Sequence, residues 1–160
     1  MAKLQITNPD ELNQQVLAFL RQDELDYPGG AIKFGEAALP FLSELIASND
    51  EMLATKATYL AGYIGGDSGA AVIEKAADAG FSTVRLAAAF GAKSLPDSLA
   101  KSVLSKSLDD HDPGVQKLAL RSITDRKLHA AFKTKLQKLA KGGMNDDLKS
   151  QAATLVKKIK

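Results

Sequence analysis

Five side chains are spaced so that they could form one binding surface. Tyr59, Phe90 and Arg121 follow one another at one constant interval, and the same interval separates Leu86 from Lys117. Exposed aromatic patches rimmed by charge are typical of protein-binding sites. The spacing therefore predicts a patch that binds a protein or peptide partner. The alternative is that the N-terminal segment or the curvature of the chain covers these residues.

A basic segment lies between Lys117 and Lys141, where Asp125 is the only acidic residue. Such a cluster could bind phosphates or an acidic protein surface. No aromatic residue interleaves Lys133, Lys135 and Lys138 for base stacking, and these lysines do not share one helical stripe. An ordinary solvated face is the favoured interpretation, and nucleic acid is not the expected partner. The candidate basic patch comprises Arg126, Lys127, Lys133 and Lys138.

One tetrapeptide, Gly66-Asp67-Ser68-Gly69, matches the surroundings of the nucleophile in trypsin-like proteases. That chemistry needs a His base and a buried Asp on a scaffold of strands. Both histidines of this chain lie in its C-terminal half, which has a helical pattern. We expect Asp67 or Ser68 to cap a helix instead, and we predict no enzymatic activity.

The sequence indicates no metal or cofactor site. His111 lies among Asp109, Asp110 and Asp112, but metal sites usually draw ligands from several elements at fixed spacing. A solvated turn with helix capping is the favoured interpretation. The chain has no cysteine, which excludes disulfides and thiolate ligands.

The elements that position these residues recur along the chain. Leu53, Ala57 and Ala61 return one interval later as Val84, Ala88 and Ala92, and after a second interval as Val115, Ala119 and Ile123. A slightly longer step leads to Leu148, Ala152 and Val156. A fixed period of about 31 residues is typical of a solenoid. The central Ala of each set is expected to let a neighbouring helix approach closely.

The pattern predicts helical pairs after one isolated helix. Asn8 as N-cap and Pro9 at the first turn open the isolated helix, which runs to about Asp23 and ends before Tyr27-Pro28-Gly29-Gly30. We expect residues 1–27 to form an N-terminal capping helix and residues 28–160 the repeat domain. The predicted pairs are about 31–47 with a helix capped by Asn49 or Asp50, 68–79 with one opened by Ser82 or Thr83, 96–108 with 113–124, and 126–141 with 145–159.

The repeat units resemble HEAT-like repeats. Asp112-Pro113-Gly114-Val115, followed by Ala119 and Ile123, is similar to the Asp-Pro-x-Val…Ala turn and second helix of that family. Val84-Arg85-Leu86-Ala87-Ala88-Ala89 is similar to its Val-Arg-x-x-Ala-Ala. The resemblance covers about residues 38–160. It implies an all-α fold, a short α-solenoid of about four helix pairs whose second helices line a concave binding face.

Composition and charge bound the remaining possibilities. The N-terminus lacks the apolar core of a signal peptide and no run is long enough for a membrane span, so we expect a cytoplasmic protein. Residues 1–80 carry five Lys/Arg and 12 Asp/Glu, a net charge of −7, whereas residues 81–160 carry 16 and seven, a net charge of +9. This division points to an electrostatic partner or to weak head-to-tail self-association. The alternative is a chance distribution of solvated surface charge.

The leading functional prediction is a non-enzymatic scaffold that binds a protein or peptide on its concave face, and the basic segment allows that partner to be acidic. The resemblance to HEAT-like proteins implies two alternatives, a nucleic-acid-binding protein similar to DNA glycosylases and a helper similar to chromophore lyases. A salt-sensitive, self-associating structural protein is a further alternative.

Overall fold

In the computed structural model, which describes residues 8–159, every regular element is a helix, so the predicted all-α class is confirmed. The elements are α1 (Pro9–Leu20), α2 (Tyr27–Phe34), the 3-10 helix η1 (Gly35–Ala38), α3 (Leu39–Ile46), α4 (Glu51–Ile64), α5 (Gly66–Ala76), α6 (Ser82–Gly91), the 3-10 helix η2 (Ala92–Ser94), α7 (Asp97–Leu108), α8 (Pro113–Asp125), the 3-10 helix η3 (His129–Phe132), α9 (Lys133–Gly142) and α10 (Asp146–Lys157). Within residues 8–159 no helix combines the length and apolar character that crossing a membrane requires.

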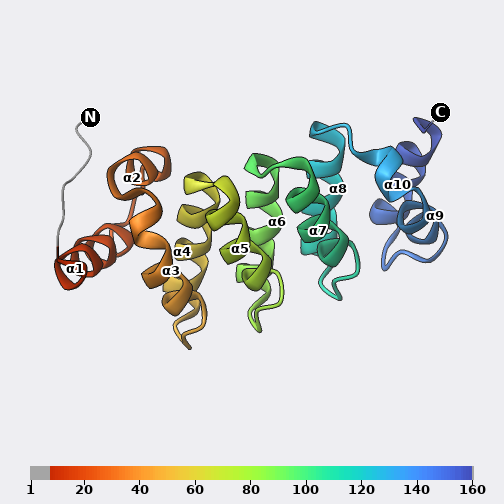
Figure 1. The fold of residues 1–160 in the computed structure, drawn as a ribbon. Coiled ribbons are helices and arrows are strands. Elements are labelled where there is room, and N and C mark those ends of the chain that lie inside the picture. The colour runs from red at the N-terminus through yellow and green to blue at the C-terminus, as the bar shows by residue number, and fades with distance from the viewer. Residues whose placement is uncertain (1–7, 160) are drawn as a thin grey trace.

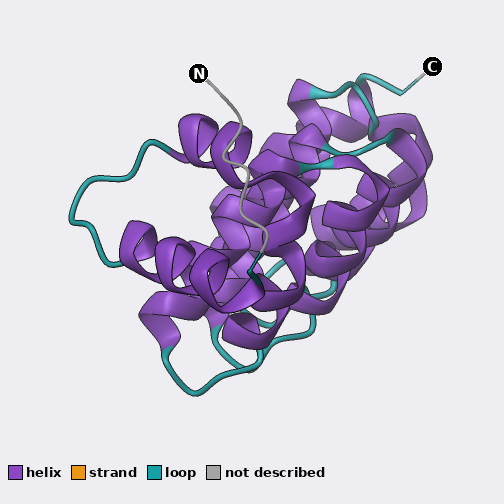
Figure 2. Ribbon diagram, turned by 60° about the vertical axis from the view of Figure 1, so that its left-hand side comes forward, coloured by secondary structure: helices purple, strands orange, loops and turns teal. Residues whose placement is uncertain are grey.

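The helices follow one another in chain order from one end of the molecule to the other (Figure 1). One series of contacts joins α2 to α4, α4 to α6, α6 to α8 and α8 to α10. A second series joins α3 to α5 and α5 to α7. Loops on the surface connect the helices, as the view in Figure 2 shows. The apolar core therefore extends along the molecule between neighbouring helices.

Each of the helices α4, α6, α8 and α10 buries a small residue. Ala57, Ala88, Ala119 and Ala152, in α4, α6, α8 and α10, are all fully buried. A Cβ atom added to Gly62 would lie 3.1 Å from the Cα atom of Gly91, so α4 and α6 meet backbone to backbone at this point.

Polar caps begin four of the long helices. The side chain of Asn8 accepts a hydrogen bond from the backbone N–H of Asp10 at 3.0 Å, and that of Asp50 accepts one from Leu53 at 3.0 Å. Asp112 caps α8 and Asn145 caps α10 in the same way. These bonds satisfy backbone donors that a helix start would otherwise leave unpaired. The caps predicted at Asn8 and Asp50 are therefore confirmed.

The first helix ends before Tyr27-Pro28-Gly29-Gly30, as predicted, but this tetrapeptide is not a break, because it begins α2. Asp26 caps the helix by accepting a hydrogen bond from Gly29 N–H at 3.0 Å, and Pro28 lies in the first turn, where a missing N–H costs nothing. A Cβ atom on Gly30 would lie 2.5 Å from the ring of Phe19, so this glycine permits the contact between α1 and α2.

Two other predicted helices have different boundaries. The helix expected over residues 31–47 is divided into α2, η1 and α3, since Gly35 has a φ of 60° and Pro40 lies in the first turn of α3. The helix expected over residues 126–141 begins only at His129, and it is divided into η3 and α9. The helix predicted to open at Ser82 or Thr83 does begin at Ser82, and no side chain caps it.

The predicted cap of α5 by Asp67 or Ser68 is also wrong. Gly65 is the residue before α5 and no side chain caps this helix. The same glycine ends α4 with φ 66° and ψ −153°, a conformation open only to glycine. Gly66 follows with φ 68°, so two consecutive glycines turn the chain from α4 directly into α5.

One buried ion pair joins α6 to the turn between α7 and α8. Arg85 Nε donates to Asp110 Oδ2 at 2.8 Å and Arg85 Nη2 to Asp110 Oδ1 at 3.2 Å. The Nη1 group of Arg85 also donates to the carbonyl oxygens of Ala79 and Gly80, both at 3.0 Å. The two charged side chains are only 10% and 5% exposed, so each depends on the other for compensation of its charge.

The alanine contacts lead to a first prediction. Ala88→Leu should lower the free energy of unfolding by about 1–3 kcal/mol, because the added carbons overpack the contact of α6 with its neighbours. The matched control is Ala71→Leu at an exposed position of α5, which should change stability by less than about 0.5 kcal/mol. Urea unfolding followed by circular dichroism measures both changes. Equal stability of the two variants would contradict the close contact at Ala88.

The buried ion pair leads to a second prediction. Asp110→Asn should cost about 3 kcal/mol, because Arg85 keeps its charge in a buried site without a carboxylate. The exposed pair of Lys106 with Asp78, at 2.8 Å, supplies the control. Asp78→Asn should cost no more than about 1 kcal/mol. The same urea titration compares them, and a larger loss for Asp78→Asn would overturn this assignment.

Candidate functional site

An open groove on α6, α8 and α10 contains three of the five predicted binding residues. Leu86 comes from α6, Lys117 and Arg121 from α8, and the groove has a volume of 470 Å³. Leu86 and Leu118 are half-buried and form its apolar surface, whereas Lys117 and Arg121 are exposed. Asp125 also lines the groove, so two cations face one carboxylate. The arrangement suits an apolar side chain with a carboxylate beside it.

The two cations of the groove differ in their surroundings. Lys117 Nζ lies 3.2 Å from Asp147 Oδ2, and both side chains are exposed. The pKa of Asp147 is lowered, first by the hydrogen bond that Gln151 donates to it at 3.0 Å and then by Lys117. Among residues 8–159 no carboxylate lies within ion-pair distance of Arg121. Arg121 is thus the cation that can pair with a partner without breaking an existing bond.

The other two predicted binding residues, Tyr59 and Phe90, pack against each other. Their ring centroids are 5.4 Å apart in an edge-to-face arrangement. Tyr27 of α2 adds a ring 5.7 Å from Tyr59 and stacks on Tyr63 at 5.8 Å. Lys93 Nζ lies 3.6 Å from the centre of the Phe90 ring, a cation–π contact. We call Tyr27, Tyr59, Tyr63 and Phe90 the aromatic cluster.

A second open hollow of 440 Å³ lies beside the aromatic cluster, between α2, α4 and α6. Tyr27 and Tyr59 line one part of it, and Met52, whose side chain is 64% exposed, lines another. Tyr27 and Tyr59 are half-buried. Met and Tyr are both enriched at protein interfaces. Leu86 and Phe90 are one turn apart on α6, so the cluster and the groove adjoin along that helix.

The five predicted residues therefore divide between two neighbouring features. The groove brings together Leu86, Lys117 and Arg121, and the aromatic cluster brings together Tyr59 and Phe90. The ring of Tyr27 partly covers Tyr59, so residues before the predicted repeats do reach this surface. Sequence reasoning missed Tyr27 and Tyr63, although Tyr63 follows Tyr59 by one helical turn.

The predicted basic patch does not remain intact. Arg126 is only 18% exposed at its side chain because its guanidinium donates to the carbonyl oxygens of Ala92, at 2.9 Å, and Leu95, and pairs with Asp97. Arg126 therefore links the end of α8 to the start of α7, and its charge is paired within the fold. The prediction that Arg126 belongs to a surface patch is wrong. Lys127, Lys133 and Lys138 are exposed.

The carboxylates around His111 each have another partner. Asp109 pairs with Lys135, Asp110 pairs with Arg85, and Asp112 caps α8 by accepting hydrogen bonds from the N–H groups of Gly114 and Val115. The favoured interpretation of this segment as a turn with helix capping matches these contacts. Within the part of the chain that the structure describes, no three His, Asp or Glu side chains are grouped as metal ligands would be.

No protein-family model matches the sequence, and no curated protein matches it significantly. The functional assignment therefore depends on the geometry of the groove and the aromatic cluster.

The aromatic cluster leads to a third prediction. Burial, followed by the proximity of Tyr59 and Tyr63, raises the pKa of Tyr27 from 10.0 to about 12, and burial raises that of Tyr59. The folded protein holds these protons more tightly than the unfolded chain does. The stability that these groups contribute should therefore be fully present below pH 10 and should be lost as the pH rises from about 10 towards 12.

Ultraviolet absorbance of tyrosinate measures this titration directly. Tyr27→Phe should remove the ionisation step with the highest pKa, and the urea-unfolded protein should show all tyrosines ionising near pH 10. Superimposable titration curves for folded and unfolded protein would contradict the packing of the cluster.

Proposed function

We propose that the protein is a non-enzymatic scaffold that binds a protein or peptide segment on the face formed by α4, α6, α8 and α10. In this proposal the chain is a short HEAT-like α-solenoid of about four pairs, namely α3 with α4, α5 with α6, α7 with α8, and α9 with α10. The burial of the four equivalent alanines and the contacts in chain order support this interpretation. In it, α1 and α2 cover the N-terminal end of the core, where Leu12, Val16 and Leu20 are buried.

The groove is the observation that carries the proposal. Leu86 and Leu118 offer apolar surface, and Lys117 and Arg121 lie beside it. A complementary segment carries an apolar side chain next to Asp or Glu. The positive charge of this part of the chain favours an acidic partner, since residues 81–160 have a net charge of +9.

The free energies of single contacts indicate how much of the surface such a partner must cover. Burying one Leu-sized side chain is worth about 1.5–3 kcal/mol, and an exposed ion pair adds at most about 1 kcal/mol. A dissociation constant of about 1 μM corresponds to about 8 kcal/mol. A partner that occupied only the groove would bind weakly, so we expect it to continue along α6 and to contact the aromatic cluster and Met52.

Nucleic acid is the less well supported partner. Of the basic side chains in the segment from Lys117 to Lys141, Arg126 is held by Asp97 and Lys135 by Asp109. The aromatic rings lie on α2, α4 and α6, away from this segment in the sequence. Stacked bases and bound phosphates would therefore need different parts of the surface.

A displayed library of random peptides tests the proposal. Selected peptides should carry an apolar residue flanked by Asp or Glu, and Leu86→Ser combined with Arg121→Glu should weaken their binding at least tenfold. The control is Lys101→Glu, which removes an exposed cation of α7 and should leave the affinity unchanged. Fluorescence anisotropy with a labelled selected peptide measures each affinity. Equal affinity of the groove variant and the control would remove the groove from consideration.

A further inference from the structure

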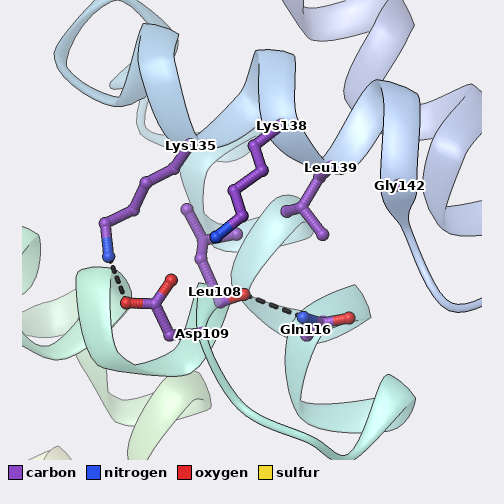
Figure 3. Close-up of a pocket in the computed structure, with 7 residues that line it drawn as sticks. All are labelled: Leu108, Asp109, Gln116, Lys135, Lys138, Leu139 and Gly142. Atoms are coloured by element: carbon purple, nitrogen blue, oxygen red, sulfur yellow. Dashed lines mark hydrogen bonds and ion pairs between the residues drawn. The ribbon is translucent and has the colours of Figure 1, made fainter.

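A separate cavity of 330 Å³ lies where the end of α7 and the start of α8 meet α9. Leu108, Gln116, Lys138 and Leu139 are among its lining residues (Figure 3). It shares no residue with the groove, and Gln116 and Lys117 are neighbours in α8 of which the first is buried and the second exposed. The cavity is therefore a distinct feature of the molecule.

Gln116 is the residue that makes this cavity unusual. Its side-chain nitrogen donates to the carbonyl oxygen of Leu108 at 2.8 Å. Its Oε1 atom is buried and has no hydrogen-bond partner among the described residues, and the residue is only 6% exposed. The opposite amide orientation would set Oε1 against another acceptor, so the orientation is determined by Leu108. An unpaired buried acceptor is unfavourable, and a ligand donor would satisfy it.

Comparison with Arg85 shows how this acceptor arises. Arg85 precedes Gln116 by one repeat interval and occupies the same position in α6 that Gln116 occupies in α8. Both side chains donate to carbonyl oxygens near the end of the preceding helix. Arg85 uses its remaining N–H groups to bind Asp110. Gln116 instead presents an oxygen, so the group that completes its bonding must be a donor.

The rest of the cavity wall defines the other properties of a ligand. Figure 3 shows Lys138 extending from α9 towards Leu108. Asp109 and Lys135 also line the cavity and are paired with each other. Among residues 8–159 no carboxylate lies within ion-pair distance of Lys138, so the wall has one cation without a counter-charge. Leu108 and Leu139 are almost completely buried and form the apolar part of the wall. A complementary molecule carries a negative charge, an N–H or O–H donor and an apolar group.

We propose that this cavity binds a carboxylate with a neighbouring N–H group, the chemistry found at the last residue of a polypeptide chain. The N–H group donates to Gln116 Oε1, the carboxylate accepts from the Lys138 ammonium group, and an apolar side chain lies against Leu108 and Leu139. The same chemistry occurs in free N-acylated amino acids, and we assign the site to the polypeptide terminus. This inference does not depend on the groove.

Three small probes separate the contributions of the ligand groups. N-acetyl-L-leucine has the carboxylate, the N–H donor and the side chain; isocaproate lacks the N–H group, and N-acetyl-L-leucine methyl ester lacks the charge. Titration followed by NMR of the Gln116 side-chain amide should give saturable binding of the first probe, with binding at least tenfold weaker for each of the others. Equal affinity for isocaproate would show that Oε1 is not used and would overturn the proposal.

Two peptides with leucine at the end, one with a free carboxylate and one amidated, identify the source of the ligand. The free peptide should bind more tightly than N-acetyl-L-leucine, and amidation should reduce its affinity at least tenfold. If the free acid binds and neither peptide does, the assignment to a polypeptide terminus is wrong. If no probe saturates, the cavity holds only water and the site does not exist.

Single substitutions in the cavity wall test which side chains bind the ligand. Gln116→Met removes the acceptor at similar side-chain length, and Lys138→Met removes an exposed charge without affecting the core; each should weaken binding of the free peptide at least tenfold. Lys157→Met, an exposed lysine of α10, is the control and should bind normally. Leu86→Ser should also bind normally, which distinguishes this site from the groove. Unchanged affinity in Lys138→Met would overturn the proposal even if Gln116→Met failed to fold.

Discussion

The close approach of α4 to α6 depends on two facing glycines, because a side chain on either of them would fill the space between the helices. Ala57, Ala88, Ala119 and Ala152 are fully buried, and Gly62 meets Gly91 with almost no space between the two backbones. The short distance also allows Ser122 in α8 to donate a hydrogen bond to the carbonyl oxygen of Ala89 in α6 at 3.2 Å. Larger residues from the other helices then fill the core on either side of this contact.

This constraint determines which side chains remain for binding. In α6 most residues are buried, and after Thr83 only Leu86 and Phe90 keep part of their surface accessible. In α6 the consequence is visible over two adjacent residues, since Arg85 is buried in a bond with Asp110 and Leu86 contributes to the groove. The chemistry of the outward face is therefore free to differ between helices whose inward faces are alike. That freedom explains why aromatic rings occur on α4 and α6 and cations on α8.

Local rules in the sequence were sufficient for much of the helical structure. The caps at Asn8 and Asp50 and the turn before Pro113 follow from residues within one helical turn of each helix start. The start of α2 is not predicted, because proline followed by two glycines favours a break. In the structure Pro28 lies in a first turn and Gly30 permits contact with Phe19. Helix ends of this kind depend on contacts with another helix, which a local pattern does not contain.

The sequence identifies only part of the candidate site, because a local pattern does not contain contacts between distant helices. The constant repeat interval identified outward positions, and three of the five residues line one groove. It could not show that Arg126 turns back to the carbonyl oxygen of Ala92, because that bond depends on the path of the chain after α6. Nor could it show that Tyr27 lies against Tyr59, since Tyr27 was expected to lie in a break between helices.

The aromatic cluster has a spectroscopic consequence. The chain contains three tyrosines and no tryptophan, and all three tyrosines belong to this cluster. The intrinsic fluorescence of the protein therefore comes from one small region, where α2, α4 and α6 meet. Tyrosine emission therefore reports on the surroundings of this region without any label. It does not report on structural changes around α9 and α10.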